Sequence, residues 1–375
     1  MDTQKRFDLI TQNTEEVLTD EHLKELISQG EKLKHYIGFE ISGKVHLGTG
    51  LMSMQKVNDF QKANVDCSIF LADWHSWIND KLSGDIEFIQ KAAIGYFKEG
   101  IIASLKCVGG DTEKLKFVMG SKLYHNNDEY WQTVIEVSKN TTLKRIMRST
   151  TIMGRQQAEG IDFAKLIYPP MQVSDIFIME RNIAHAGMDQ RTAHVVALEV
   201  AKKLKIKPLL NKKKEIIKPV AIHHPLILGL QEPSEWPLTA EKAREIWSNM
   251  KMSKSVPNSA VFVNDSPEEI RMKLKKAFCP AKEIEYNPVL NWVQRLVFVD
   301  QPILKIERPE KFGGNVEFES YDALTKAFQE GDVHPLDLKN AMAEFLIKKL
   351  EPARKHMDKP KIKKIEEEMM ELISR

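Results

Sequence analysis

Cysteine is scarce in this sequence, with 3 in 375 residues. Cys67, Cys107 and Cys279 lie far apart and form no CxxC pair, so we expect reduced thiols and neither disulfides nor a zinc site. Long apolar runs are also missing, because residues 68–72, one of the most apolar segments, are far fewer than the ~20 residues of a membrane span. The N-terminus lacks the basic-then-apolar order of a signal peptide. These absences predict a soluble, cytoplasmic protein without a membrane segment.

A large excess of one charge is missing as well. The 55 basic and 53 acidic side chains give a net charge of +2, which argues against a protein coated in cationic charge. The charges are nevertheless unevenly distributed, since residues 202–218 contain eight lysines and the single acid Glu215. A solvated surface is the simplest interpretation of such a run, and its role stays open.

Short apolar segments alternate with helical patterns in the first half of the chain. Hydrophobic residues form 42% of the sequence, enough for a packed core. The length predicts two domains, at roughly 100 to 200 residues each. The patterns predict strands at residues 34–41, 67–72, 115–119 and 220–223, and helices at 46–63, 85–105, 169–180 and 188–204. This βαβ order predicts an α/β fold with a doubly wound parallel sheet of the Rossmann type.

The pattern becomes helical after about residue 262. Ser266, Pro267 and Glu269 are typical of a helix start with a capping box, and helical spacing continues over residues 289–298, 320–329 and 335–350. We therefore expect an α-helical domain to follow the sheet domain. The predicted segments are a helical N-terminal segment 1–30, a sheet domain 31–228, an insert and loop 229–265, and a helical domain 266–375.

A glycine-rich segment joins the first predicted strand to the first helix. In a doubly wound sheet, ligands bind at the carboxyl ends of strands, and a helix start there offers free backbone N–H groups to phosphate. Gly38 and Gly48 allow a nucleotide to approach the backbone, and His46 and Thr49 can each donate a hydrogen bond to a phosphate. By itself, this motif is equally compatible with an ordinary glycine-rich turn.

A second polar motif, KMSKS, occupies residues 251–255 near the predicted end of the sheet domain. Lys251, Ser253 and Lys254 form a cationic loop that can close over a triphosphate and stabilise the charge that develops during phosphoryl transfer. A lone pentapeptide of this kind can be an ordinary surface loop. The two motifs in this order and separation are far more specific.

With both motifs, the chain resembles the class I aminoacyl-tRNA synthetases, and in particular the archaeal and eukaryotic tyrosyl-tRNA synthetases. The words that carry this resemblance are YIGFEISGKVHLG, FLADWH, TTLKR, IYPPMQVSD, GMDQR, NDSPEEIR, ERPEKFGG and HPLDLKNAMAEFL. It extends over about residues 36–350, except for the lysine-rich stretch and the insert 231–249. The resemblance implies that residues 31–228 form the catalytic domain and 266–375 the anticodon-binding domain.

One predicted helix carries a polar stripe that suits an amino-acid site. Tyr168, Gln172 and Asp175 fall at positions i, i+4 and i+7, hence on one face, among apolar neighbours. Spacing alone leaves two interpretations open: a solvent-facing stripe, or buried groups that a bound ligand would satisfy. In the resembling family these positions bind tyrosine. The resemblance assigns the amino group to Tyr168, Gln172 and Gln190, assigns the phenol to Tyr36 and Asp175, and places His75 in the same pocket.

The resemblance also implies the reaction. The tyrosine carboxylate attacks the α-phosphate of Mg²⁺-ATP, and tyrosine is then transferred to the 3′ end of tRNA(Tyr). No metal bound by the protein itself is implied. Thr49 departs from the family pattern, because it replaces the second histidine of the HIGH element and cannot carry a charge. We therefore expect His46, Lys251 and Lys254 to do more of the phosphate stabilisation.

Contacts with tRNA and a subunit arrangement follow from the resemblance alone. Arg148 and Arg191 are implied to contact the first base pair of the acceptor stem. Three further residues are implied to contact the anticodon, namely Phe312, His334 and Asp337. The residues by themselves leave Phe312 open as a core aromatic and Asp337 open as a helix N-terminal acid. A homodimer is implied as well.

Three other functions remain to be separated from this prediction. A nucleotidyltransferase that activates another carboxylate would not need the helical domain. A catalytically silent paralogue would not need His46, Lys251 and Lys254 intact. A tryptophanyl-tRNA synthetase shares the fold, but Tyr36 and Asp175 favour a phenolic ligand.

Overall fold

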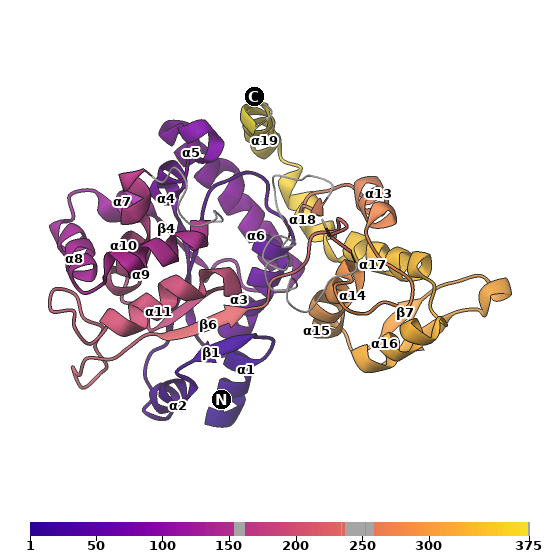
Figure 1. Ribbon diagram of the computed structural model, residues 1–375, viewed down its shortest axis with the longest axis horizontal. Coiled ribbons are helices and arrows are strands. Elements are labelled where there is room, and N and C mark those ends of the chain that lie inside the picture. Colours follow the sequence, from indigo (N-terminus) through magenta and orange to yellow (C-terminus); the bar gives the residue numbers. More distant parts are fainter. Residues whose placement is uncertain (154–161, 234, 237–251, 253–258, 374–375) are drawn as a thin grey trace. The chain divides into compact units, whose positions relative to one another are not determined.

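The computed structural model describes residues 1–153, 162–233, 235–236, 252 and 259–373 (Figure 1). This part of the chain packs into two compact units. The first unit combines the described residues of Met1–Gly43, Ser53–Pro225 and Pro360–Arg375, and the second those of Lys44–Met52 and Leu226–Lys359. None of the described helices is both long and apolar enough to span a membrane.

A six-stranded sheet forms the centre of the first unit as described, in the order β1-β6-β5-β2-β3-β4. Its strands are β1 Glu16–Leu18, β2 Lys34–Phe39, β3 Asp66–Leu71, β4 Lys116–Met119, β5 Ile183–Gly187 and β6 Val220–His224. The five strands from β2 to β6 run parallel, and β1 pairs antiparallel with β6 at one edge. The predicted doubly wound α/β fold is therefore confirmed.

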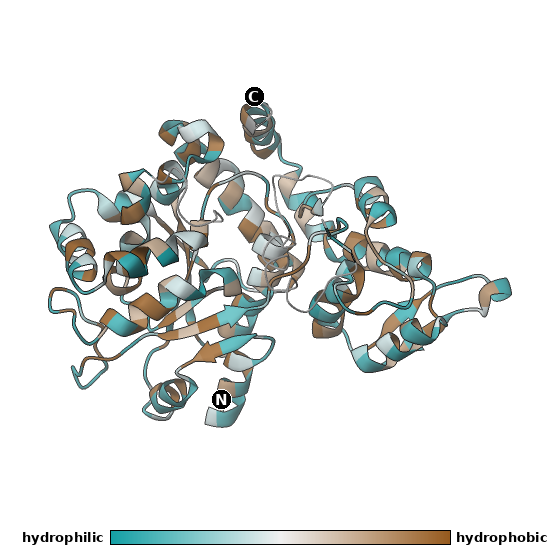
Figure 2. Ribbon diagram, viewed as in Figure 1, coloured by the Kyte–Doolittle hydropathy of each residue, from teal (hydrophilic) through white to brown (hydrophobic). Residues whose placement is uncertain are grey.

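Burial explains why these short segments form strands. Five of the six residues of β3 are buried, as are all five of β6, so the segments are covered on both faces and need not alternate apolar with polar residues. Helices supply this cover, and Figure 2 shows brown and teal stretches alternating along many of them. Cys67 in β3 and Cys107 are free thiols within this packing, as is Cys279 in the second unit.

The helices of the first unit include counterparts of the four predicted ones, with different bounds, and several that were not predicted, among them residues 128–139 and 143–149. They are α1 Thr3–Thr11, α2 Asp20–Ser28, α3 Ser53–Lys62, α4 Asp73–Ile78, α5 Ile86–Ala92, α6 Lys98–Cys107, α7 Gly120–Tyr124, α8 Asp128–Lys139, α9 Leu143–Ser149, α10 Phe163–Ile178, α11 Arg191–Val200 and α19 Pro360–Ile373. Shorter helical turns are η2 Lys81–Gly84, η3 Ala93–Phe97, η4 Thr150–Met153 and η5 Met188–Gln190. The N-terminal segment is more than helical, because β1 lies between α1 and α2 and extends the sheet.

The second unit is mainly helical. Its elements are η1 Gly48–Met52, α13 Pro267–Lys276, α14 Pro288–Trp292, η7 Val293–Val297, α15 Phe298–Asp300, η8 Glu310–Phe312, α16 Tyr321–Glu330, α17 Pro335–Lys349 and α18 Glu351–Met357. The predicted capping box of α13 is present, with Ser266 and Glu269 exchanging hydrogen bonds. A two-stranded antiparallel ribbon, β7 Leu304–Ile306 with β8 Val316–Phe318, was not predicted.

The compact units divide the chain differently from the predicted segments. Backbone hydrogen bonds join Leu47 to Val261 and Val263 to Val45, which places the glycine-rich turn in the second unit. The C-terminal helix α19, by contrast, packs on η2, η3 and α5 of the first unit. At its contact with η3, a Cβ on Gly95 would come within 2.1 Å of the Ile365 Cδ1 atom, so a larger residue there would have to displace the end of that side chain. The glycine-rich turn and α19 therefore each belong to a different unit from the segments next to them in the sequence, because contacts with distant segments hold them there.

A buried ion pair supports the turn that pairs with His46. Asp265 is 1% exposed and accepts hydrogen bonds from the backbone N–H of Phe262 (2.8 Å) and from Lys273 Nζ (2.6 Å). Phe262 in turn forms an isolated β-bridge with His46. Burial raises the pKa of Asp265, and Lys273 opposes that shift.

We expect Lys273→Met to destabilise the second unit by about 3 kcal/mol, because it leaves the Asp265 carboxylate buried without its cation. Arg271→Met is the matched control on the same helix, since the Arg271–Glu344 pair is about half exposed and should cost about 0 to 1 kcal/mol. Chemical denaturation followed by tryptophan fluorescence measures both. Equal losses for the two variants would contradict the assigned role of the buried pair.

Candidate active site

The sheet order creates a switch point between β2 and β5. From β2 the chain continues outward through β3 and β4, and then returns to the other side of β2 to form β5 and β6. In doubly wound sheets, the crevice at the carboxyl ends of the strands that flank this reversal binds ligands. Tyr36 lies in β2, and Gln190 ends the turn η5 that follows β5. The predicted tyrosine residues therefore converge on this edge of the sheet.

The polar stripe of α10 lies inside the protein. Tyr168 is 5% exposed and Asp175 is fully buried, while Gln172 between them is half-buried. The interpretation of this stripe as solvent-facing is therefore excluded. Buried polar groups need hydrogen-bond partners, so the surroundings of each one indicate which partner is missing.

Asp175 is the most constrained of these groups. Its Oδ1 accepts a hydrogen bond from the hydroxyl of Tyr124 (3.1 Å), whereas its Oδ2 has no hydrogen-bond partner among the described residues. His75 Nε2 lies 3.7 Å from Oδ2, beyond hydrogen-bond distance. Burial raises the pKa of Asp175 well above its usual range, although Tyr124 and the nearby Tyr130 hydroxyl, which does not meet hydrogen-bond geometry, oppose this shift. One more donor at Oδ2 would satisfy the carboxyl group.

Two aromatic side chains complete this end of the cluster. Burial lowers the pKa of His75 to about 3, so its imidazole is neutral at physiological pH. Burial, and secondly the charge of Asp175, raise the pKa of Tyr36 well above 10, so Tyr36 keeps its hydroxyl hydrogen. A Cβ on Gly38 would come within 2.7 Å of the Tyr36 hydroxyl oxygen, so this phenol requires glycine two residues later.

An amide pair forms the other end of the cluster. Gln172 Nε2 donates to Gln190 Oε1 (3.2 Å), and Gln190 Nε2 donates to the backbone oxygen of Ile152 (3.0 Å). The remaining oxygen, Gln172 Oε1, has no hydrogen-bond partner in the described part of the chain. An acceptor of this kind, held by a chain of hydrogen bonds, suits an ammonium group.

The Tyr168 hydroxyl reaches a carboxylate that the sequence did not single out. It donates to Glu40 Oε1 (2.9 Å), which also accepts from Asn79 Nδ2 (2.8 Å). Glu40 follows directly after β2, and Tyr124 ends the helix that follows β4. Their positions after parallel strands were therefore a usable signal for Glu40 and Tyr124, because ligand sites gather there.

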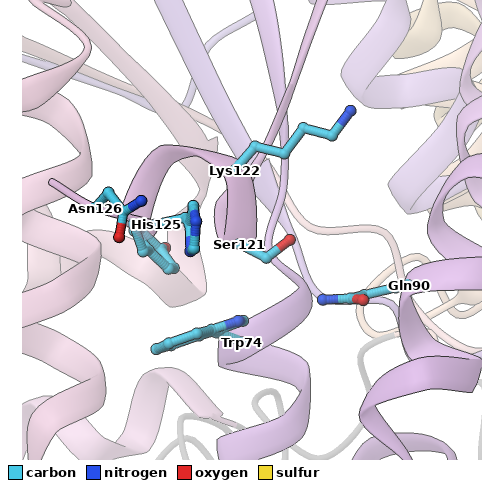
Figure 3. Close-up of a pocket in the computed structure, with 7 residues that line it drawn as sticks. Trp74, Gln90, Ser121, Lys122, His125 and Asn126 are labelled. Atoms are coloured by element: carbon cyan, nitrogen blue, oxygen red, sulfur yellow. The ribbon is translucent and has the colours of Figure 1, made fainter.

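A pocket of about 530 Å³ shares Tyr124 with this cluster. Figure 3 shows the ring of Trp74 across from Ser121 and His125, with Gln90 to one side and Lys122 extending away. The buried Asp73 accepts hydrogen bonds from the Ser121 backbone (2.9 Å) and from Gln90 (3.1 Å). The Ser121 bond anchors α7, the helix that carries Tyr124, beside α4, which carries His75, and the Gln90 bond anchors α5 to α4.

His46 and Thr49 belong to the second unit, whereas the cluster around Asp175 belongs to the first. His46 Nδ1 accepts hydrogen bonds from the backbone N–H groups of Gly48 (3.1 Å) and Thr49 (3.2 Å). A neutral ring therefore carries its hydrogen on Nε2, which lies 3.1 Å from Thr49 Oγ1. If Nε2–H donates to that oxygen, the hydrogen of the Thr49 hydroxyl is directed to another acceptor.

The predicted lysine loop lies outside the described residues, so Lys251, Ser253 and Lys254 have no structural account. Met252 between them is described, and its backbone N–H donates to the oxygen of Ile227 (3.0 Å). The insert 231–249 also lies mostly outside the described part of the chain.

The two arginines predicted to contact tRNA differ in their surroundings. Arg148 is exposed on α9. Arg191, at the start of α11, forms an ion pair with Glu16 in β1 (2.7 Å). Neither residue belongs to the cluster around Asp175.

The lysine-rich stretch follows α11 and includes an exposed turn. Leu210 and Ile216 form an isolated β-bridge, and the lysines at 212–214 lie in the turn between them. Lys207 instead pairs with Glu129 and Glu180 (3.4 Å each). Most of the stretch is a solvated surface, and the structure assigns it no further role.

The three predicted anticodon residues are exposed or half-buried in the second unit. Phe312 is 61% exposed, so it is not a core aromatic. His334 caps α17 by accepting from the backbone of Leu336 (3.1 Å), and Asp337 lies in the first turn of that helix. Arg308 joins the two segments, because it donates to the oxygens of Gly314 and Asp332 (2.6 Å each). Phe312 is therefore held on a braced loop near the start of α17.

Comparisons with known proteins agree with this geometry. Residues 28–351 match the model of the family described as tRNA synthetases class I (W and Y). The tyrosine–tRNA ligase of Thermococcus sibiricus is 58% identical over 362 residues, 96% of each chain. The crystal structure of tyrosyl-tRNA synthetase complexed with L-tyrosine from Pyrococcus horikoshii matches over 100% of both chains, at 56% identity and a TM-score of 0.94.

More distant structures separate the two branches of this family. Tyrosyl-tRNA synthetase from Aeropyrum pernix is 40% identical, with a TM-score of 0.82 over 99% of this chain and 100% of that one. Tryptophanyl-tRNA synthetase from the same organism, at 16% identity and a TM-score of 0.65, covers 95% of this chain and 85% of that one and shares the fold alone.

The doubly wound sheet with a polar cluster at its switch point, together with the family match over residues 28–351, identifies a class I aminoacyl-tRNA synthetase. The chain belongs to the class I tRNA synthetases of the tryptophan and tyrosine family. Within that family it belongs with the tyrosyl-tRNA synthetases of archaeal type, so it is an ATP-using aminoacyl-tRNA ligase.

We expect Thr49→Val to lower kcat/KM for ATP by about tenfold, because a hydrogen bond to a charged phosphate is worth roughly 1.5 kcal/mol or more. Thr49→Ser keeps the hydroxyl and should stay near the parent activity. Tyrosine-dependent ATP–pyrophosphate exchange measures both variants. A Thr49→Val enzyme with unchanged kcat/KM would show that the Thr49 hydroxyl contacts no phosphate.

Proposed function

We propose that the cluster around Asp175 is the tyrosine site of this ligase. The observation that carries the proposal is the buried carboxyl group of Asp175, which Tyr124 holds through Oδ1 and whose Oδ2 has no donor among the described residues. A phenol hydroxyl at Oδ2 supplies the missing hydrogen bond. The Tyr36 hydroxyl is a second partner, because its raised pKa keeps it a neutral donor and acceptor.

This arrangement discriminates against phenylalanine by leaving groups unpaired. Without the ligand hydroxyl, Oδ2 of Asp175 stays buried and unsatisfied, at a cost of about 1 to 3 kcal/mol. Tyrosyl-tRNA synthetases are the established example of such discrimination through a lost hydroxyl. A tryptophan ring offers an indole N–H instead of a phenol, so the Tyr36 and Asp175 pair favours tyrosine.

The opposite end of the same cluster would hold the amino group. Gln172 Oε1 accepts one ammonium hydrogen, and Gln190 fixes Gln172 through its own amide. The Tyr168 hydroxyl already donates to Glu40, so its oxygen is left to accept a further ammonium hydrogen. His75, neutral and 4.5 Å from the Tyr168 ring centroid, forms part of the wall.

The chemical step would use Mg²⁺-ATP as substrate. The tyrosine carboxylate attacks the α-phosphate and pyrophosphate leaves, so no covalent intermediate with the enzyme forms. We assign the phosphates to Thr49, Lys251 and Lys254, with Gly38, Gly48 and Ser253 in contact with the nucleotide, and we assign His46 to the positioning of Thr49. Thr49 donates its hydroxyl hydrogen, while His46 orients it through Nε2.

The activated tyrosine then passes to the 3′ end of tRNA(Tyr). We assign the first base pair of the acceptor stem to Arg148 and Arg191, because arginine matches phosphate and guanine edges. In the second unit, Phe312 offers an exposed ring for stacking on an unpaired base. Asp337 can accept from a guanine edge, and His334 lies beside it at the start of α17. These assignments place the anticodon-binding segment within residues 266–359, because the predicted segment 266–375 includes α19, which packs in the first unit.

A homodimer and a cytoplasmic setting complete the proposal. Four apolar side chains are exposed on three helices, of which α8 and α9 both pack on α10. They are Ile135, Leu143, Met147 and Phe163, the last 76% exposed. We assign these exposed apolar side chains to the subunit interface, because burying them against a partner removes apolar area from water. The three free cysteines fit a reducing compartment, where translation takes place.

We expect Tyr36→Phe to reduce the preference for tyrosine over phenylalanine by about tenfold, because one partner of the ligand hydroxyl is lost.

Asp175→Asn should reduce activity with tyrosine by about 10-fold to 100-fold, because the amide replaces an acceptor oxygen by a donor. ATP–pyrophosphate exchange with each amino acid measures the ratio of kcat/KM values. Tyr96→Phe, at a buried tyrosine on η3, is the matched control. An unchanged ratio in both site variants would overturn the tyrosine assignment.

We expect Asp337→Ala to lower kcat/KM for tRNA charging by about tenfold, because one base-edge contact is worth roughly 1 to 3 kcal/mol. ATP–pyrophosphate exchange needs no tRNA and should not change. Asp322→Ala removes an acid from the first turn of α16 and controls for the lost helix-end charge. Equal losses in charging and exchange would refute an anticodon role for Asp337.

A further inference from the structure

Strand β1 brings a carboxylate beside a predicted tRNA contact. β1 pairs antiparallel with β6, and Glu16 stands opposite His223 in the register. Arg191, at the start of α11, donates a hydrogen bond to the same carboxylate. Three elements far apart in the sequence therefore meet at Glu16.

The contact between Arg191 and Glu16 uses one edge of the guanidinium group. Arg191 Nε donates to Oε2 (2.7 Å) and Oε1 (3.0 Å), and Nη2 donates to Oε1 (2.8 Å). This side-on arrangement engages Nε–H and one Nη2–H of the five donors of arginine. The end-on pair, Nη1 with the second hydrogen of Nη2, is not used by Glu16, and Arg191 is 44% exposed.

Two buried histidines hold Glu16 from behind. His223 Nδ1 lies 3.1 Å from Glu16 Oε2, and since an ionised carboxylate only accepts, Nδ1 carries the hydrogen. His223 Nε2 is then an acceptor for His194 Nδ1–H, 3.0 Å away. This leaves His194 Nε2 without a hydrogen, and that atom has no partner among the described residues. Each hydrogen bond from His194 through His223 to Glu16 therefore has a defined donor and a defined acceptor.

The network fixes the orientation of the Arg191 guanidinium group and adds little to the stability of the fold. Arg191 and Glu16 are 44% and 25% exposed, and ion pairs near the surface contribute about 0 to 1 kcal/mol. His223 and His194 are 0% and 1% exposed, so the acceptor is anchored on a rigid base. An arginine held along its Nε edge presents its end-on donors in one orientation, which suits bidentate recognition of a guanine edge.

We propose that Glu16 is a positioning residue that aims Arg191 at the acceptor stem of tRNA, with His223 and His194 holding Glu16 in place. The inference rests on the role proposed above for Arg191. It gives the N-terminal segment a part in tRNA recognition: the edge strand β1 supplies the carboxylate, and the sheet register with β6 sets its position.

The experiment compares Glu16→Gln, Arg191→Ala and the double variant in two assays. Gln keeps the size of Glu16 and one acceptor oxygen, but it cannot receive both Arg191 and His223 as the carboxylate does. ATP–pyrophosphate exchange should be unchanged in Glu16→Gln, which also shows that this variant folds. kcat/KM for charging of tRNA(Tyr) should fall about tenfold in Glu16→Gln and further in Arg191→Ala. The double variant should be no worse than Arg191→Ala.

A second readout separates positioning from general support of the fold. Charging of a tRNA(Tyr) transcript with its first base pair exchanged gives the discrimination ratio, which Glu16→Gln should lower about tenfold. Glu180→Gln is the matched control, because Glu180 pairs with Lys34 at the opposite, amino-terminal edge of the sheet. If Arg191→Ala loses charging while Glu16→Gln keeps charging and discrimination, the positioning role is overturned. Unchanged charging in Arg191→Ala would instead overturn the role of Arg191 itself, and the positioning role with it.

Discussion

A fully buried carboxyl group without a cation, Asp175, is the constraint around which the first unit is built. Burial makes its charge expensive, so every neighbour must either donate to it or stay neutral. Tyr124 donates from α7, the phenol of Tyr36 approaches from β2, and burial keeps His75 uncharged. Asp73 then holds α7 beside α4. Its Oδ2 has no hydrogen-bond partner among the described residues, and the proposed tyrosine site rests on this atom.

The other polar networks are built in a similar way: in each one, a hydrogen-bond partner fixes the orientation of a second polar side chain. Gln190 aims Gln172, Glu40 anchors Tyr168, and His223 anchors Glu16. In the second unit, the backbone N–H of Gly48 donates to His46 Nδ1, and this bond orients His46 Nε2 toward the Thr49 hydroxyl. Such bonds add little net stability, but they remove alternative orientations before a substrate binds. The threonine in place of the second histidine is therefore integrated into the turn as an oriented hydroxyl.

Local patterns predicted most of the regular structure. The parallel strands are short apolar runs with turns on either side, and the capping box of α13 is visible as Ser266, Pro267 and Glu269. Strand β5 and the helices α4, α7, α8 and α9 were not predicted. The other misses share one cause. β1 is a three-residue edge strand, and the β7–β8 ribbon consists of two three-residue strands, too short for a period to show. Likewise, residues 45–47 join the second unit, and α19 the first, through contacts with distant segments.

For the site, the sequence alone identified the residue types and their spacing on α10, because a helix brings i, i+4 and i+7 to one face. It left open whether that face was exposed to solvent or buried, and it did not identify Tyr124, Glu40 or Glu16 as residues of these networks. Those three act through partners 51, 128 and 175 positions away, namely Asp175, Tyr168 and Arg191. Only the packing of strands and helices brings such residues within hydrogen-bond distance, since no local propensity encodes a contact at that separation.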